Sequence, residues 1–237
     1  MKKVLIVIAA VVIVMFLSKD FVASTIFTSG VRAFTDLPAS VKSMKVGIFK
    51  SAVDIGGFKV YNPKSAFKDR VMLDMPALYI DYDLGSMLTG TKHIRKMKLE
   101  LNEFYVIKNA GGELNLDSLK GIQSKASGSQ GAKQDMKLKI DVLELKIGKV
   151  IYKDYTKGAT PFVKEFNIGL DERYENIDNP YVFASLVVFK ALANTGIASL
   201  TNFDIGSLKD TASGALSTAT DAVNKAAESI KGLFDKK

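Results

Sequence analysis

The feature that most constrains the fold is a strand-like pattern that occurs three times, each copy 46 positions after the one before it. The middle copy, Met97 to Val106, alternates apolar and polar residues, skips a position at Asn102-Glu103, and then resumes the alternation. Strict alternation is typical of a half-buried strand, and a Gly or Asn at the skip indicates a bulge that returns both apolar sets to one face. The pattern therefore predicts three equivalent bent strands.

Three such strands should curl together and share one apolar inner face. A sheet of this kind must bury that face against another layer, close into a barrel, or offer it to a ligand. We expect a filled core, because single domains rarely leave large apolar patches uncovered, and an open lipid groove is the alternative. The candidate groove-lining or core-lining residues are Val53, Ile55, Phe58, Val60, Leu99, Leu101, Phe104, Val106, Leu145, Ile147, Val150 and Tyr152.

The chain begins with two lysines and then an unbroken apolar run from Val4 to Leu17. As a helix this run is about 21 Å long, short of the roughly 30 Å hydrocarbon core of a bilayer, so length alone leaves an anchor, a cleaved signal and a buried helix open. The bulky Phe21 at the best cleavage position favours an uncleaved anchor whose helix continues through Phe27. The lysines at the start predict an N-terminus in the cytoplasm and the rest of the chain outside it. In a double-membraned bacterium, this is a single-pass inner-membrane protein with most of its chain in the periplasm.

The remaining sequence completes an α+β prediction with three parts. Residues 1–36 form the N-terminal transmembrane helix, and residues 37–175 form a curved, mostly antiparallel repeat sheet, either a groove or a half-barrel. Residues 176–237 form helices packed on that sheet. Within the sheet region, residues 122–135 are predicted to be a flexible excursion, because they are rich in Ser, Gly, Lys and Gln and poor in large apolar residues.

Individual elements follow from local signals. Pro76 interrupts the run from Val71 to Leu84 and lacks a ladder donor, which predicts an edge strand or a bulge. Phe162 to Leu170 is expected to be a weaker strand. Asn115 or Asp117 is expected to cap a short helix, and Asn179, directly before a proline, is expected to start a longer one.

Two C-terminal segments are helical in pattern. Tyr181 to Leu200 carries a single charge, Lys190, and we expect a helix buried against the sheet, with a second membrane span as the alternative. Leu216 to Leu233 repeats apolar residues at spacings of three and four beside several lysines. This amphipathic stripe can dock on its own sheet, which is the default, on a partner helix, or on a membrane surface.

Few residues suggest chemistry. The chain has no cysteine and one histidine, His93, for which a solvated role is expected. Asp81 and Asp83 would share one face of a strand, where they fit the polar side of an amphipathic strand better than a pair of catalytic or metal-binding carboxylates. The net charge of +8 comes from lysines spread along the whole chain, which favours anionic lipid head groups over nucleic acid. We predict no enzyme, no cofactor and no metal site.

Three motifs, in this order after the N-terminal run, carry a resemblance: IGGFKVYNP at 55–63, IDYDLGSML at 80–88 and GGELNLDSL at 111–119. The chain resembles a short member of the AsmA-like family, which belongs to the repeating β-groove lipid-transfer proteins. The resemblance implies an inner-membrane anchor, a curved sheet whose concave face shields phospholipid acyl chains, and a role in outer-membrane homeostasis. The chain lacks the many further repeats of long family members, so it does not bridge a periplasm alone.

Two functional hypotheses follow. The first is a membrane-anchored module that binds or helps to transfer lipid in envelope homeostasis, with phospholipid acyl chains as its ligand. The second is a structural or scaffold protein of an envelope complex, with a self-filled core and a protein partner held by the C-terminal amphipathic helix. A hydrolase dependent on His93 is a distant third.

Overall fold

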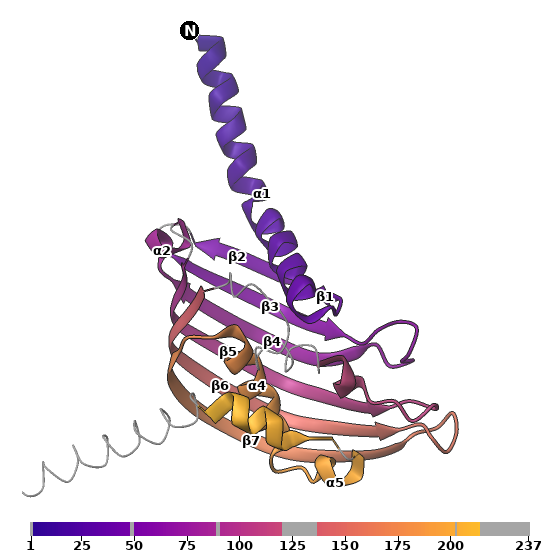
Figure 1. Ribbon diagram of the computed structural model, residues 1–237. Helices are drawn as coiled ribbons and strands as arrows, with labels where there is room; N and C mark the ends of the chain where they lie inside the picture. Colours follow the sequence, from indigo (N-terminus) through magenta and orange to yellow (C-terminus); the bar gives the residue numbers. More distant parts are fainter. Residues whose placement is uncertain (1, 48–49, 89–90, 120–136, 202, 214–237) are drawn as a thin grey trace, which may run out of the picture.

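A computed structural model describes residues 2–47, 50–88, 91–119, 137–201 and 203–213, with the backbone alone for residues 2–17, 87, 88, 91 and 137. These residues form one sheet of seven strands together with helices (Figure 1). In chain order the elements are α1 (Lys2–Thr35), β1 (Ala39–Ser40), β2 (Ser43–Gly47), β3 (Ala52–Tyr61), β4 (Val71–Tyr82), α2 (Leu84–Leu88), β5 (Thr91–Lys108), the 3-10 helix η1 (Asn115–Leu119), β6 (Lys137–Asp154), β7 (Phe162–Ile177), α4 (Pro180–Leu192) and α5 (Ile197–Thr201).

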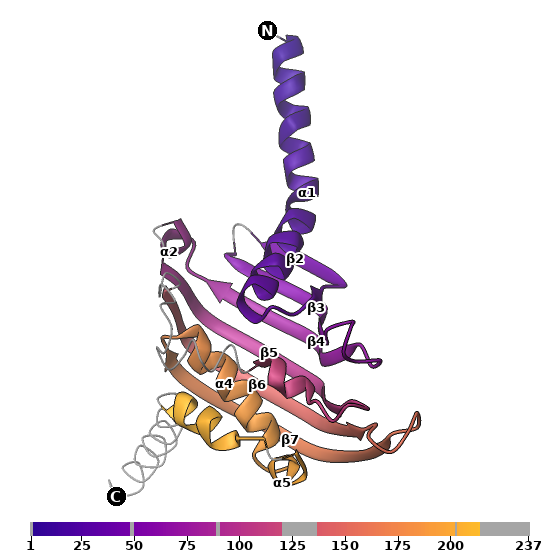
Figure 2. The same ribbon diagram turned by 45° about the vertical axis from the view of Figure 1, so that its right-hand side comes forward.

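The sheet is open and curved, in the order β1-β3-β4-β5-β6-β7, with β2 also paired to the outer edge of β3 (Figures 1 and 2). Every pairing is antiparallel except β5 with β6, which is parallel. The predicted α+β fold with a curved, mostly antiparallel sheet is confirmed at this level. The three-part division of the chain stays a prediction, and the excursion at 122–135 lies outside the described residues.

The repeat spacing seen in the sequence is the register of the parallel pair. Met97 pairs with Leu143, Leu101 with Ile147 and Phe104 with Val150, so the same offset of 46 positions runs from one end of the two strands to the other. Equivalent residues of the second and third copies are therefore direct neighbours on one face. Side chains in register pack like against like, which explains why the two copies share the same apolar pattern.

The skip in the alternation forms a bend that crosses the sheet. Leu101 and Phe104 are both fully buried on either side of the skip in β5, and Ile147 and Val150 are buried in the same way in β6. The register between β6 and β7 shifts at the same level, between Ile147 and Lys149. The prediction that the skip returns both apolar sets to one face is confirmed.

Glycine is required at two points of this bend. Gly57 in β3 has a φ of +62°, and an added Cβ would lie 2.8 Å from the Cβ of Lys42. A Cβ at Gly148 in β6 would lie 2.7 Å from the carbonyl oxygen of Asn102, on the neighbouring strand β5. That oxygen belongs to the backbone and cannot rotate away. The bend therefore depends on close backbone approach as well as on glycine's freedom of conformation.

We expect Gly148→Ala to lower the free energy of unfolding by about 1–3 kcal/mol, because the new methyl group forces two paired strands apart. Gly30→Ala is the matched control. No atom lies within 4 Å of a Cβ at Gly30, which is exposed in α1, so the same substitution there should raise stability by about 0.5–1 kcal/mol. Urea denaturation followed by circular dichroism measures both, and equal effects would refute the role of the close approach.

The expectation that β4 is an edge strand is wrong. β4 lies between β3 and β5, so Pro76 sits inside the sheet. Pro76 and Ala77 are consecutive exposed residues, and the register with β5 is the same before them, at Asp74, and after them, at Ala77. Pro76 lies on the bend, where the alternation of buried and exposed residues skips one position in β4 as it does in β5.

The last strand is longer than expected. The predicted strand ended at Leu170, whereas β7 continues to Ile177 and pairs with β6 along its whole length. Glu172 broke the apolar pattern, but its carboxylate forms an ion pair of 2.7 Å with Lys190 of α4. The ammonium group of Lys190 therefore compensates the charge of Glu172 within the strand.

Helices cover the concave face of the sheet. Figure 2 shows α4 and the helical residues 205–213 on the same side of the sheet as η1. Their apolar residues join the inner face of the sheet in one buried cluster, as do Phe27 and Phe34 of α1, which are partly buried. The core of the described residues is therefore filled by the chain's own helices.

The helix expected over Tyr181 to Leu200 is in fact two helices. Asn179 caps α4 as predicted, because its Oδ1 accepts hydrogen bonds from the backbone N–H groups of Tyr181 and Val182. The helix ends at Leu192, and Gly196, with a φ of +66°, precedes α5. The predicted short helix is observed as η1, but Asn115 is its first residue and does not cap it, because its side chain bonds to Ile107, Tyr105 and Asn62. The amphipathic stripe from Leu216 to Leu233 lies outside the described residues.

The N-terminal helix is clamped to the edge of the sheet. Asp20 accepts a hydrogen bond of 2.8 Å from the N–H of Val46, and Lys19 donates one of 2.7 Å to the carbonyl of the same residue. These bonds satisfy the outward-facing N–H and carbonyl groups of Val46, at an edge where the described residues place no further strand beside β2. Among the side chains described, no helix is long and apolar enough to cross a bilayer. The side chains of the predicted anchor, Val4 to Leu17, lie outside that set.

Candidate functional site

The twelve residues predicted to line the inner face come together on one face of the sheet. Eleven of them are at most 6% exposed, and Val53 is partly buried. The three repeat copies thus contribute to a single continuous surface, as their pattern indicated. Whether that surface contacts lipid depends on what covers it.

The cover is made of apolar side chains from four segments: α1, η1, α4 and residues 205–213. The ring of Phe27 in α1 packs edge-on against Phe58 of β3, with ring centroids 5.2 Å apart. Leu116 of η1 and Leu186 of α4 are fully buried in the same cluster. Phe34 of α1 also stacks on Tyr181 of α4, with centroids 5.1 Å apart. The candidate lining residues are therefore core residues in this conformation.

One polar cluster lies where α4 meets β7. Lys190 pairs with Glu172 at 2.7 Å and lies over the ring of Tyr174 at 5.5 Å, and the hydroxyl of Tyr174, whose side chain is fully buried, donates to the same carboxylate. Burial raises the pKa of Glu172, but the hydrogen bonds from Lys190 and Tyr174 outweigh it, so the pKa is lowered. Burial and the bond to Glu172 raise the pKa of Tyr174. The cluster attaches the covering helix to the sheet.

This cluster predicts a loss of stability in acid. A carboxyl group whose pKa is lowered by folding stabilises the fold at pH values above its ordinary pKa of 4.5. This contribution is lost as the pH falls through the lower pKa of the folded state. We expect Glu172→Gln to reduce the dependence of melting temperature on pH between about pH 5 and pH 2. Glu100→Gln, at an exposed position of β5, is the control. Identical acid profiles of the Glu172 variant and the wild type would contradict the prediction.

One buried hydroxyl in the covering helix has no partner among the described residues. The Oγ of Ser185, in α4, makes no hydrogen bond although the residue is 1% exposed. An unpaired buried polar group lowers stability. The packing of α4 on the sheet therefore contributes less stability at Ser185 than a paired or apolar side chain would give.

Two of the resemblance motifs meet in a buried amide network. Asn62, from the Asn-Pro pair, and Asn115, from the NLD segment, are both fully buried, and the Nδ2 of Asn115 donates to the Oδ1 of Asn62 at 3.0 Å. Asn115 also donates to the carbonyl of Tyr105 and accepts from the N–H of Ile107. These bonds hold the loop after β3 and the helix η1 against the end of β5.

The third motif is also structural. Asp83, directly after β4, accepts a hydrogen bond of 2.6 Å from the backbone N–H of Ser86 and so caps α2. That bond is the main reason why the pKa of Asp83 is lowered. Asp81 forms an ion pair with Arg95 of β5, and Arg95 also lies 3.8 Å from Asp83. The two aspartates therefore act in capping and cross-strand pairing, in agreement with their predicted place on a polar face.

His93 is more involved than the sequence suggested. Its Nε2 lies 2.7 Å from the Oδ2 of Asp141 on β6, and both side chains are partly exposed. Lys139 pairs with the other oxygen of that carboxylate at 2.9 Å. Burial raises the pKa of Asp141, but the bonds from Lys139 and His93 outweigh it and lower the pKa. His93 thus joins β5 to β6, and the prediction of a merely solvated side chain misses this pair.

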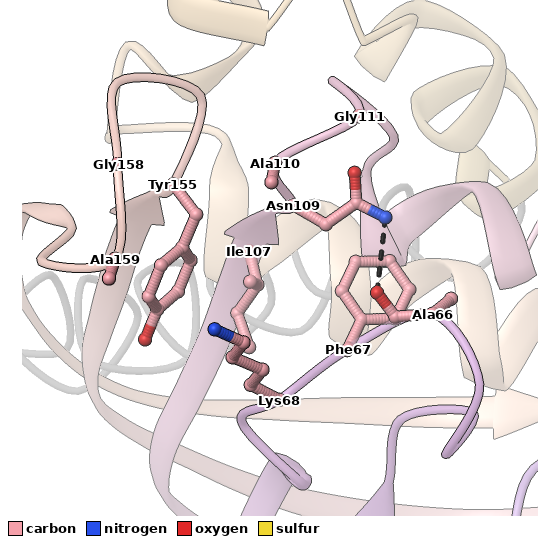
Figure 3. A pocket seen from close by; sticks show the side chains of 10 residues that line it. All are labelled: Ala66, Phe67, Lys68, Ile107, Asn109, Ala110, Gly111, Tyr155, Gly158 and Ala159. Carbon is pink, nitrogen blue, oxygen red and sulfur yellow. Dashed lines mark hydrogen bonds between the residues drawn. The ribbon is translucent and has the colours of Figure 1, made fainter.

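A pocket of about 320 Å³ lies at the end of the sheet where β5 and β6 terminate (Figure 3). Three connections form it: the loop after β3, the turn after β5 and the loop after β6. Tyr155 at its wall donates to Asp69 at 2.7 Å, and burial together with this bond raises its pKa to about 12. Sequence reasoning missed this pocket, because its residues are far apart in the chain. They are Ala66, Phe67, Lys68, Ile107, Asn109, Ala110, Gly111, Tyr155, Gly158 and Ala159.

The apolar face and the pocket differ in the polar groups that they contain. Among the described residues, no three side chains of His, Cys, Asp or Glu are grouped to hold a metal ion. The pocket lining combines apolar walls with the ammonium group of Lys68 and with an amide and a phenol that bond to neighbours, such as Asn109 to the carbonyl of Ala66 at 3.1 Å.

Comparison of the chain with protein-family models, with curated proteins and with solved structures finds no match in any of the three. The resemblance to the AsmA-like family therefore stays a prediction that rests on the three motifs. The contacts above show that these motifs place capping and amide groups at the ends of strands. They carry information about the fold, and none of them forms a reactive site.

Proposed function

We propose that this chain is a non-enzymatic structural or scaffold protein of the bacterial envelope, held at the inner membrane by the first half of α1. One observation carries the proposal: the curved apolar face is occupied by the chain's own helices, with eleven of the twelve candidate lining residues at most 6% exposed. A face filled in this way is a core, and it leaves the outer surfaces and the C-terminal segment for partners.

Lipid binding of the AsmA-like kind is the second candidate, and a specific observation favours it. The cover over the apolar face consists of helices, and the hydroxyl of Ser185 in α4 is buried without a partner among the described residues. Displacement of α4 would expose a continuous apolar surface that suits phospholipid acyl chains. This candidate requires a change of conformation, whereas the structural role does not.

Photoactivatable phospholipids distinguish the two. The full chain is reconstituted into vesicles that contain a phospholipid with a diazirine on its acyl chain, illuminated, digested and analysed by mass spectrometry. The structural role predicts cross-links in the N-terminal half of α1 and none in residues 97–106 or 143–152. Cross-links within those two segments would overturn the structural role in favour of lipid binding.

The proposed topology has its own test. The chain has no cysteine, so a single Lys157→Cys variant carries one thiol, at an exposed position of the loop after β6. A periplasmic sheet predicts labelling by a maleimide that crosses the outer membrane but not the inner membrane in intact cells. Labelling only after the inner membrane is broken would place the sheet in the cytoplasm.

A further inference from the structure

The part of α1 that follows the apolar run has two very different faces. On one face Phe27, Val31 and Phe34 pack against the core. On the other, Phe21 is 76% exposed and Ile26 is 67% exposed. Large apolar side chains this exposed are unusual on the surface of a folded domain and indicate a binding surface when they lie together.

The two charged residues near this exposed face are bonded to the sheet edge, with the side chain of Lys19 26% exposed and that of Asp20 39% exposed. Lys19 and Asp20 are the only charged residues between Lys3 and Arg32. They lie 2.6 Å apart and both bond to the backbone of Val46 on β2. In the sequence they end the apolar run, but in the structure they are bonded to the sheet edge. The first charged residue among the exposed positions of α1 beyond Ser18 is Arg32.

The length of the uncharged stretch of α1 can be compared with the thickness of a bilayer. The run from Val4 to Leu17 is about 21 Å long and falls short of a bilayer core of about 30 Å. On the exposed face, the uncharged stretch continues along the same unbroken helix through Ile26. From Val4 to Ile26 the helix is about 34 Å long, which is sufficient to cross that core.

We infer that the face of α1 with Phe21, Val22 and Ile26 lies in the acyl-chain and glycerol region of the bilayer. The clamp fixes Val46 of β2 at the depth of Lys19 and Asp20, so this edge of the sheet enters the interfacial region of the membrane. The domain does not hang on a free stalk. This inference rests on the proposed membrane anchor and adds to it a fixed height and orientation of the sheet.

Tryptophan fluorescence tests the inference directly, because the chain contains no tryptophan. Phe21→Trp and Ile26→Trp each place one emitter on the exposed face, and Ala33→Trp places one at an exposed position farther along the helix. Each full-length variant is reconstituted into phosphatidylcholine and phosphatidylglycerol vesicles, with bromine either near the top or near the end of the acyl chains.

The expected result is blue-shifted emission and strong quenching by the brominated lipids for Trp at 21 and 26. The deeper bromine should quench the emitter at 21 more than the one at 26, while the Ala33 variant should be quenched by iodide in water. Blue-shifted emission without bromine quenching would mean that protein, such as a second copy, covers the face and would overturn the inference. Iodide quenching at 21 and 26 would also overturn it.

Flotation separates this inference from the anchor itself. Vesicles are floated on a density gradient after washing with alkaline carbonate. Protein that floats but shows water-exposed tryptophan at 21 and 26 keeps the anchor and refutes the inference. Protein that stays at the bottom of the gradient refutes the anchor, and the inference fails with it.

Discussion

Phe104→Ala should lower the free energy of unfolding by about 3–5 kcal/mol, the range measured when a large aromatic side chain is removed from a core. Phe104 is fully buried beside the bend of β5, and its register partner Val150 is buried next to it. The expected loss is a large fraction of the total stability of a domain. Urea denaturation of the full chain in detergent, followed by circular dichroism, measures it.

Phe162→Ala is the matched control. Phe162 begins β7 and is 59% exposed, so the same substitution should change stability by about 0.5 kcal/mol or less. A small loss at Phe104, close to that of the control, would mean that the helices over the concave face contribute little. That outcome would favour the lipid-binding candidate, in which the cover is displaced.

This prediction also constrains how lipid binding can be tested. A charged residue at Leu101 or Phe104 would abolish a lipid groove, but both side chains are fully buried in the filled core. An unpaired buried charge is strongly destabilising, so loss of lipid from such a variant would reflect unfolding. Cross-linking of the unmodified chain avoids this difficulty.

Asn115→Ala should lower the free energy of unfolding by about 3 kcal/mol or more, because it leaves three buried polar groups without partners at about 1–3 kcal/mol each. The groups affected are the N–H of Ile107, the carbonyl of Tyr105 and the side-chain oxygen of Asn62. Asn167→Ala, at an exposed position of β7, is the control. Urea denaturation again gives the difference.

A double-mutant cycle tests whether the two asparagines act as a unit. Residues in one hydrogen-bond network show interaction energies of about 0.5–3 kcal/mol, whereas independent sites give additive losses. We expect Asn62→Ala and Asn115→Ala to be non-additive, since each removes a partner of the other. Additive losses would show that the bond between them contributes nothing measurable.

The two asparagines also limit what the family resemblance can mean. A motif shared with a lipid-transfer family suggests function, but Asn62, Asp83 and Asn115 all bond to backbone or to each other at the ends of strands. Such positions are required by the fold itself. The functional hypotheses therefore depend on α1 and on the state of the covered face.

The strands were the most predictable part of the protein. Alternation and the skip at Asn102-Glu103 are local properties, and their consequence, two apolar sets on one face, needs no knowledge of neighbours. The cap at Asn179 was equally local. In contrast, the internal position of Pro76 and the length of β7 depend on which strands lie beside them, and residues on other elements decide that.

The candidate lining residues were predicted as a set, but their role was not. By itself the sequence determined that twelve apolar residues share one face and that the first helix begins with a run suited to a membrane. Only the tertiary structure decided that this face is covered, that Glu172 is neutralised by Lys190, and that Lys19 and Asp20 bond to β2. The physical reason is that periodicity depends on the backbone, which is local, whereas burial and pairing depend on contacts between residues far apart in the chain.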